Sequence, residues 1–177
     1  MPGSNGTHSA RAHDGGAIIT AVRFTRIQDP FTARHDVHMP RLSGDWSLIE
    51  VCEVELASGV TGVGETIIQY TWGGVPREAV ARVVGRNVFS LLWDDTLGCG
   101  LQMAIWDAAG HQAGVPSHAL FGKQVRDAAP ISWWCLDFDD AEWVAEAELA
   151  VGLGYTCFKL KGRPWRDVIG QLDALAN

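Results

Sequence analysis

The pattern of the sequence changes near residue 129, and this change most constrains the fold. Before it, two alternating apolar runs are joined by a short glycine turn, which is typical of an antiparallel hairpin. After it, strand-like and helix-like segments alternate, which is typical of a parallel sheet. The sequence therefore predicts two structural regions, 17–129 and 130–177, preceded by a disordered leader over 1–16.

Three strands are expected in the first region. Residues 17–27 are rich in β-branched side chains, which favour strands. Residues 46–57 and 60–70 alternate between apolar and polar side chains, and Ser58–Gly59 forms the turn between them. These segments predict a three-stranded antiparallel sheet.

Helices are expected in both regions. Pro76 opens a predicted helix that Gly85 ends, and Gly114 ends a longer predicted helix over 96–113. Asp139 or Asp140 can cap the first helix of the second region. That region is predicted to form a strand, a helix, a strand and a helix, over residues 130–136, 141–154, 155–161 and 164–176.

Length, charge and cysteine spacing exclude several classes of protein. A complete eight-unit β/α barrel needs about 250 residues, and this chain has 177. The formal charge of −7 argues against a nucleic-acid or membrane-surface binder, and no apolar run approaches the roughly 18 residues of a membrane span. The four cysteines form no close pair, so we expect reduced, mostly buried thiols in a cytoplasmic protein.

The segment around Lys159 and Lys161 is the most informative candidate for chemistry. Side chains alternate along a strand, so both ammonium groups are expected on one side of the predicted strand 155–161. Each ammonium lowers the pKa of the other, and a lysine tuned in this way can act as a base. The alternative is a pair of solvated lysines that protect an edge strand from aggregation.

Other polar and aromatic candidates lie in the first region. His35 and His38 are three residues apart in a loop, but no carboxylate or cysteine group completes a metal site around them. A loop that closes over substrate is the alternative for this histidine pair. Glycines 59, 62 and 64 do not match a dinucleotide-binding fingerprint and indicate a turn and close packing. Trp72 lies near a turn, where it can line a pocket.

Several segments together resemble the mandelate racemase/muconate lactonizing enzyme group of the enolase superfamily. The resemblance runs from about Ile18 to the C-terminus, and its motifs match in order and spacing. They are Gly59-Val-Thr-Gly-Val-Gly-Glu65, Leu101-Gln-Met-Ala-Ile-Trp-Asp-Ala-Ala-Gly110, Gly114-Val-Pro116, Leu120-Phe-Gly-Lys-Gln-Val-Arg-Asp127 and Gly154-Tyr-Thr-Cys-Phe-Lys-Leu-Lys161.

The resemblance implies a fold and a reaction. It implies an α+β capping domain over 17–129, followed by the first two β/α units of an incomplete (β/α)8 TIM-type barrel over 130–177. Members of the family remove a proton α to a carboxylate with the help of Mg²⁺, as racemases, epimerases, sugar-acid dehydratases or cycloisomerases. The implied substrate is a small carboxylate, and Arg163-Pro164-Trp165 beside the lysines suggests a sugar acid.

The resemblance also implies roles for individual residues. Lys161 would be the base, and Lys159 would bind the substrate carboxylate and depress the pKa of Lys161. The loop from Phe31 to Met39, with His35 and His38, would close over the substrate. Tyr70 and Trp72 belong to a second segment that would do the same.

The sequence departs from the family in its length. The carboxylates that bind the metal come from the third, fourth and fifth barrel strands, which would follow residue 177. We therefore expect an N-terminal fragment that is inactive alone and does not bind Mg²⁺ tightly. The alternative is a non-catalytic capping module that binds a partner, complements a separate barrel fragment or self-associates through exposed barrel edges.

Overall fold

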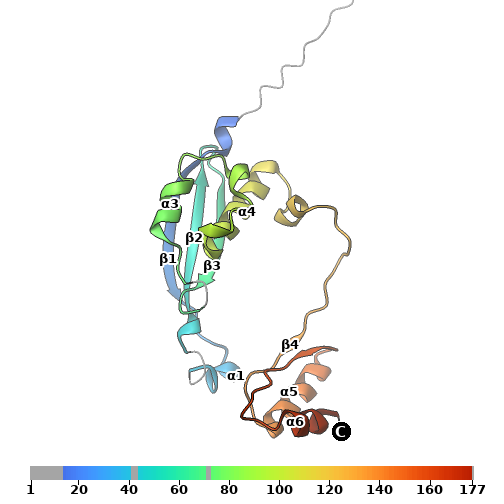
Figure 1. The fold of residues 1–177 in the computed structure, drawn as a ribbon. Helices are drawn as coiled ribbons and strands as arrows, with labels where there is room; N and C mark the ends of the chain where they lie inside the picture. The colour runs from blue at the N-terminus through green and yellow to red at the C-terminus, as the bar shows by residue number, and fades with distance from the viewer. Residues whose placement is uncertain (1–13, 41–43, 71–72, 177) are drawn as a thin grey trace, which may run out of the picture. The chain divides into compact units, whose positions relative to one another are not determined.

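The computed structural model describes residues 14–40, 44–70 and 73–176. These residues form two compact units that divide between Gln124 and Val125, and each unit is described here by itself (Figure 1). The predicted leader lies mostly outside the described residues. Its last residues belong to a short 3-10 helix, η1 (Asp14–Ala17), in which the carbonyl of Gly16 accepts a hydrogen bond from the Ser58 amide.

A three-stranded antiparallel sheet forms the centre of the first unit, as the sequence predicted. The strands β1 (Ile19–Gln28), β2 (Leu48–Leu56) and β3 (Thr61–Ile67) are hydrogen-bonded in chain order. Gly59 makes the turn between β2 and β3 with a φ of +86°, a conformation that glycine adopts without steric cost.

One face of this sheet is buried under a helix. The alternation along β2 buries Glu50, Cys52, Val54 and Leu56, as expected for a half-buried strand. The helix α4 (Cys99–Ala113) packs on this face, and its Leu101, Ala104, Ile105 and Ala108 are fully buried. The predicted close packing is confirmed, because a Cβ atom at Gly62 or Gly64 would overlap the backbone of α4.

Short helices complete the first unit. They are α1 (Ala33–Asp36), η2 (Gly44–Ser47), α3 (Arg77–Val83), η3 (Val88–Leu91), η4 (Asp95–Leu97) and η5 (Ser117–Phe121). The predicted helix over 96–113 begins at Cys99, because the Asp94 side chain caps η4 and Gly98 has a φ of +86°. Gly114 ends α4 in the left-handed conformation, as predicted.

The second unit has the predicted order of strand, helix, strand and helix. The strands β4 (Trp133–Trp134) and β5 (Phe158–Lys159) pair in parallel and are connected through α5 (Asp140–Gly152). The last helix, α6 (Val168–Ala176), starts later than the predicted residue 164. Its start is set by Asp167, whose carboxylate accepts a hydrogen bond from the Gly170 amide.

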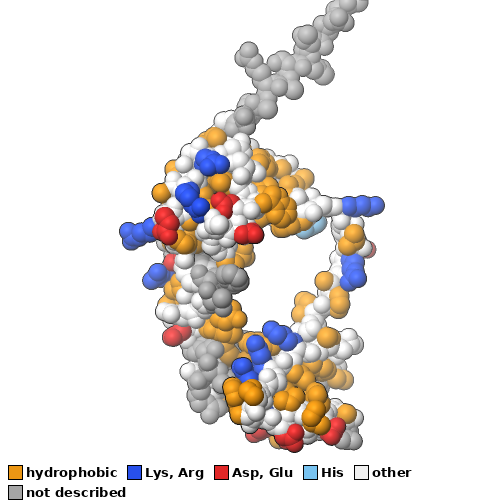
Figure 2. Space-filling view, in the orientation of Figure 1, with side chains coloured by type: hydrophobic (Ala, Val, Ile, Leu, Met, Phe, Trp, Pro, Cys, Tyr) orange, Lys and Arg blue, Asp and Glu red, His pale blue; other side chains and the backbone are white. Residues whose placement is uncertain are grey.

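Two further features describe the surface of the fold. Figure 2 shows hydrophobic side chains gathered on the α4 side of the first unit. Trp93 and Phe121, which contact Trp106 of α4, are both exposed. Within the described ranges, no helix combines the length and the apolar character that crossing a bilayer requires.

The capping box of α5 gives a direct test of the second unit. Asp139 accepts a hydrogen bond from the Glu142 amide, and the Glu142 carboxylate accepts one from the Asp139 amide. Replacing Asp139 with alanine is expected to cost about 1 kcal/mol of unfolding free energy, whereas asparagine should retain the cap. Urea denaturation followed by circular dichroism checks this, and equal losses for the two variants would contradict it.

Candidate functional site

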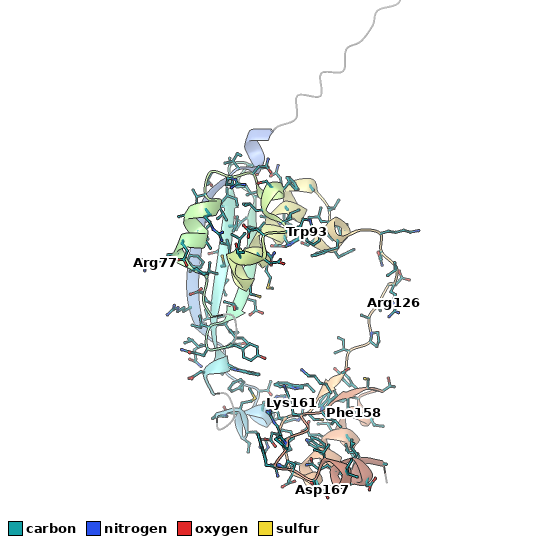
Figure 3. All side chains as sticks on the ribbon, viewed as in Figure 1. Arg77, Trp93, Arg126, Phe158, Lys161 and Asp167 are labelled. Atoms are coloured by element: carbon teal, nitrogen blue, oxygen red, sulfur yellow. The ribbon has the colours of Figure 1, made fainter. Side chains whose placement is uncertain are left out.

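The candidate site lies where two parallel strands end. Trp134 pairs with Lys159, and the Cys135 amide donates a hydrogen bond of 2.9 Å to the Lys159 carbonyl. Because paired parallel strands have their carboxyl ends at the same edge, the segments after β4 and β5 leave the sheet together. Ligands bind at this edge in open α/β sheets. Lys161, labelled in Figure 3, lies in the segment after β5.

Lys159 lies on the face of the sheet opposite α5. Its Nζ is 5.8 Å from the centroid of the Trp134 ring, which is within cation–π distance. The neighbouring Trp133 has the opposite orientation, since its Nε1 donates a hydrogen bond of 2.8 Å to Glu146 of α5. Lys159 is exposed and therefore available to an anionic ligand.

Lys161 lies beyond the strand that was expected to carry it. The strand β5 is shorter than the strand predicted over 155–161. It ends at Lys159 because β4 ends at Trp134, so the residues after Lys159 have no strand to pair with. Lys161 is half-buried and follows Lys159 by two residues. Both lysines therefore lie at the carboxyl edge, one in the strand and one just after it.

An ion-pair cluster holds the two segments after the strands together. Asp137, which follows β4, accepts a hydrogen bond of 3.1 Å from Nε of Arg166. The Nε of Arg163 is 3.5 Å from the other carboxylate oxygen and makes an ion pair without a hydrogen bond there. The Asp137 side chain is only 11% exposed. Its carboxylate is therefore occupied by two guanidinium groups.

Both helices of the second unit anchor the segment after β4. The buried Trp143 of α5 donates a hydrogen bond of 2.9 Å to the Leu136 carbonyl. Gln171 of α6, also buried, donates one of 3.1 Å to the Phe138 carbonyl. These bonds satisfy backbone acceptors on either side of Asp137 and fix this edge of the site.

The charge of this edge favours an anion. Arg163 and Arg166 pair with Asp137, whereas the printed neighbour of the Lys159 ammonium is the Trp134 ring rather than a carboxylate. A lysine ammonium and a guanidinium are the ordinary protein partners of carboxylate ligands. The arrangement can therefore bind a carboxylate and place a lysine beside it.

The remaining predicted site residues lie in the first unit. His35 is in α1, with its Nδ1 2.8 Å from Oγ1 of Thr32. Desolvation lowers the pKa of His35 first, with smaller contributions from Arg34 and His38. The loop predicted over 31–39 thus contains a helical turn. Its role as a lid over substrate stays a prediction.

Aromatic residues of the second predicted lid segment are only partly described. Tyr70 is half-exposed and packs edge-on against Trp46, with ring centroids 4.8 Å apart. Trp72 lies outside the described residues. Lys159 and Lys161 belong to the second unit, whereas His35, His38 and Tyr70 belong to the first.

The described residues offer no metal cluster, and Cys52 is not a reactive thiol. Within 14–40, 44–70 and 73–176, no three His, Cys, Asp or Glu side chains gather in a way that could hold a metal.

Of the four free cysteines, Cys52 and Cys135 are buried, Cys99 is partly buried and Cys157 is exposed, so only half are as buried as expected. Burial, with Glu50 and Glu53 nearby, raises the pKa of Cys52 to about 12, which suppresses its thiolate.

Two curated proteins are similar to this chain in sequence. No family model matches the chain. A probable glucarate dehydratase of Streptomyces coelicolor is 31% identical over 90% of this chain and 49% of its own length. A D-galactonate dehydratase of Variovorax paradoxus is 24% identical over 71% of this chain and 37% of its own length. The chain thus spans about half the length of the first curated relative and less of the second.

Solved structures show the same fold. A mandelate racemase/muconate lactonizing protein from Herpetosiphon aurantiacus superposes with a TM-score of 0.68 at 20% identity, over 90% of this chain and 48% of that one. The chain has the fold of the mandelate racemase/muconate lactonizing enzymes over about half of their length, and its three-stranded sheet with helices fits their capping domain. An enolase from Thermobispora bispora, solved with magnesium and formate, has a TM-score of 0.63 at 22% identity over 89% of this chain and 49% of that one.

Two features of this candidate site were missed in the sequence. Trp134 lies under Lys159, and the alternation in the predicted strand 130–136 could have placed it opposite Trp133. Asp137 pairs with Arg163 and with Arg166, which lies 29 residues away in the sequence. No local signal predicts these ion pairs.

Proposed function

We propose that this chain supplies the lysine base of an enolase-superfamily enzyme that removes a proton α to a carboxylate. The observation that carries the proposal is the pair Lys159 and Lys161 at the carboxyl edge of a parallel strand pair. The relationship to acid-sugar dehydratases supports this assignment.

Each residue has a distinct proposed role. Lys161 accepts the α-proton, and Lys159 binds the substrate carboxylate and lowers the pKa of Lys161 by like-charge repulsion. The ion pairs of Asp137 hold the segment that carries Lys161 against the segment after β4. The Phe31–Met39 loop and Tyr70 cover the substrate from the capping domain.

A sugar acid is the proposed substrate, and dehydration is the proposed outcome. The named activities of the two curated relatives are glucarate and galactonate dehydration. In such a reaction the base removes the α-proton as the C–H bond breaks, and the β-hydroxyl leaves as water with a second proton. The ammonium groups of Lys159 and Lys161 would hold the negative charge of the acid, since Arg163 and Arg166 are paired with Asp137.

The 177 residues by themselves are proposed to be inactive. A carbon acid is weak, so charge that develops next to the carboxylate needs a stabilising cation. Mg²⁺ supplies this in the family, but the described residues offer it no set of ligands. We therefore place no metal-dependent step on this chain and propose that residues of further barrel strands hold the ion.

A second candidate is a non-catalytic capping module that complements a separate barrel. The second unit exposes large apolar side chains, among them Val125 at 88%, Ile131 at 74% and Ile169 at 70%. Exposed apolar surface of this kind favours association. A capping module would bind the barrel through these exposed apolar side chains, and it would need no chemistry at Lys161.

Joining the chain to a barrel tests the proposed function. Residues 1–177 would be fused to the part of the S. coelicolor relative that follows the matched region, with that relative's own halves rejoined as a control. We expect Mg²⁺-dependent dehydration of glucarate or galactonate by the fusion and none by the 177-residue chain. A fusion that unfolds cooperatively and binds Mg²⁺ but turns over neither acid would favour the capping module. Turnover by the 177-residue chain alone would contradict the proposal.

A further inference from the structure

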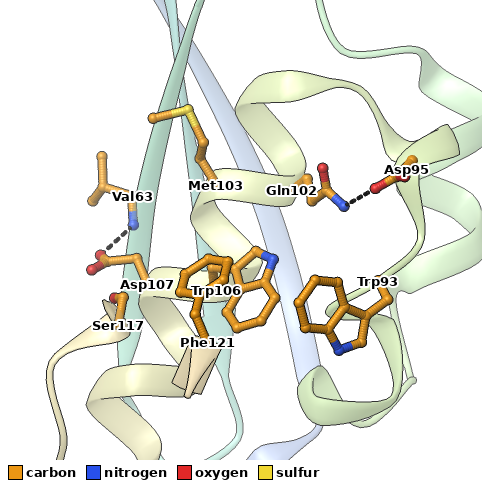
Figure 4. A pocket seen from close by; sticks show the side chains of 9 residues that line it. All are labelled: Val63, Trp93, Asp95, Gln102, Met103, Trp106, Asp107, Ser117 and Phe121. Atoms are coloured by element: carbon orange, nitrogen blue, oxygen red, sulfur yellow. Dashed lines mark hydrogen bonds between the residues drawn. The ribbon is translucent and has the colours of Figure 1, made fainter. Parts of the chain in front are cut away.

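An aromatic pocket lies on the first unit. Trp106 of α4 and Phe121 of η5 stack with ring centroids 4.0 Å apart and planes within 13°. The ring of Trp93 stands at 84° to Trp106 and at 90° to Phe121. The stack and Trp93 therefore form two aromatic walls at right angles (Figure 4).

The pocket is open and large enough for a small ligand. Its volume is about 510 Å³, which is within the range of small-molecule sites. Trp93 is 72% exposed and Phe121 is 60% exposed, while Trp106 is buried beneath them. Two large aromatic side chains that stay exposed beside a cavity present their faces to a ligand rather than to the core.

Two carboxylates lie on the rim of this pocket. Asp95 accepts a hydrogen bond of 2.9 Å from Gln102. Because the Gln102 amide is neutral, it does not compensate the negative charge of the Asp95 carboxylate. Asp107 accepts one of 2.9 Å from the Val63 amide and lies 3.9 Å from Nε2 of His111. All nine residues that line the pocket are apolar, polar or acidic, and none is basic.

We propose that this pocket binds a small organic cation, such as a quaternary ammonium compound. Aromatic faces attract a cation through their quadrupole, and the two carboxylates add a charge opposite to that of the ligand. An anion is disfavoured by the same carboxylates. A neutral apolar ligand would gain from the rings alone. The site is independent of the proposed function, since its residues belong to the first unit and the lysines to the second.

Titration with choline tests the proposal on the 177-residue chain. Its neutral isostere, 3,3-dimethyl-1-butanol, has the same shape without the charge. The indole N–H signals in a ¹H–¹⁵N spectrum at pH 8 report binding, and the Trp93 signal is identified by its loss in Trp93→Phe. We expect choline to shift the Trp93 and Trp106 signals but not that of Trp165, with an affinity about tenfold above that of the isostere.

Variants separate cation binding from simple apolar contact. Trp93→Phe keeps an aromatic face and should bind choline within about threefold of wild type, whereas Trp93→Leu should lose about tenfold. Asp95→Asn, which keeps an acceptor for Gln102, should weaken choline severalfold and leave the isostere unchanged. Equal affinities for choline and the isostere would overturn the proposal, as would the absence of localised shifts at 50 mM choline.

Discussion

Replacing Lys161 with alanine should lower kcat of the fused enzyme by about 10²–10⁴-fold, the usual contribution of a positioned general base. Alanine removes the amine that takes the α-proton. Lys161 is half-buried after β5, and Lys159 is the other lysine of this segment. The binding of the acid should change less, because Lys159 and the arginines stay in place. Steady-state kinetics on the fusion measures both quantities.

Two matched variants make this result specific. Lys123→Ala removes an exposed lysine outside the second unit and should leave kcat unchanged. Lys159→Ala should raise KM more than Lys161→Ala does, because its proposed partner is the substrate carboxylate. If Lys161→Ala and Lys123→Ala have the same kcat, Lys161 is not the base.

Gly64→Ala should destabilise the first unit by about 3 kcal/mol, the upper part of the range for overpacked sites. A Cβ atom there would overlap the Gly100 carbonyl and the Ala104 amide, both backbone atoms of α4. Backbone atoms cannot rotate away as a side chain can, so the helix must leave the sheet. Urea denaturation followed by tryptophan fluorescence measures the loss, and a failure to fold is the extreme form of the same result.

Gly15→Ala is the matched control for this substitution. A Cβ atom at Gly15 meets nothing within 4 Å, and its φ is not in the left-handed region. Its effect should stay within about 0.5 kcal/mol, as for an ordinary surface change. Equal unfolding free energies for Gly64→Ala and Gly15→Ala would show that the close contact of β3 with α4 is wrong.

Local patterns predicted most of the fold. The alternation in β2 correctly identified the strand, because burial of every second residue leaves a direct trace in the sequence. The left-handed glycines at 59 and 114 marked a turn and a helix end for a steric reason. Asp139 was recognised as a cap because its hydrogen bonds reach only three residues along the chain.

Features that depend on distant partners could not be predicted in this way. The length of β5 is limited by β4, so the sequence around Lys161 alone overestimates the strand. Proline favours the first turn of a helix, which predicts a start at Pro164. Asp167, however, provides the side-chain cap and sets the actual start of α6. The aromatic walls of Trp93, Trp106 and Phe121 come from three separate segments, and only the folded chain brings them together.

Exchange of the substrate α-proton with deuterated solvent tests the central claim most directly. Glucarate or galactonate would be incubated with the fused enzyme and Mg²⁺ in D₂O, and the recovered acid examined by NMR for deuterium at the α-carbon. We predict incorporation by the wild-type fusion and none above background by its Lys161→Ala variant. Equal incorporation by the two proteins would contradict the assignment of Lys161 as the base.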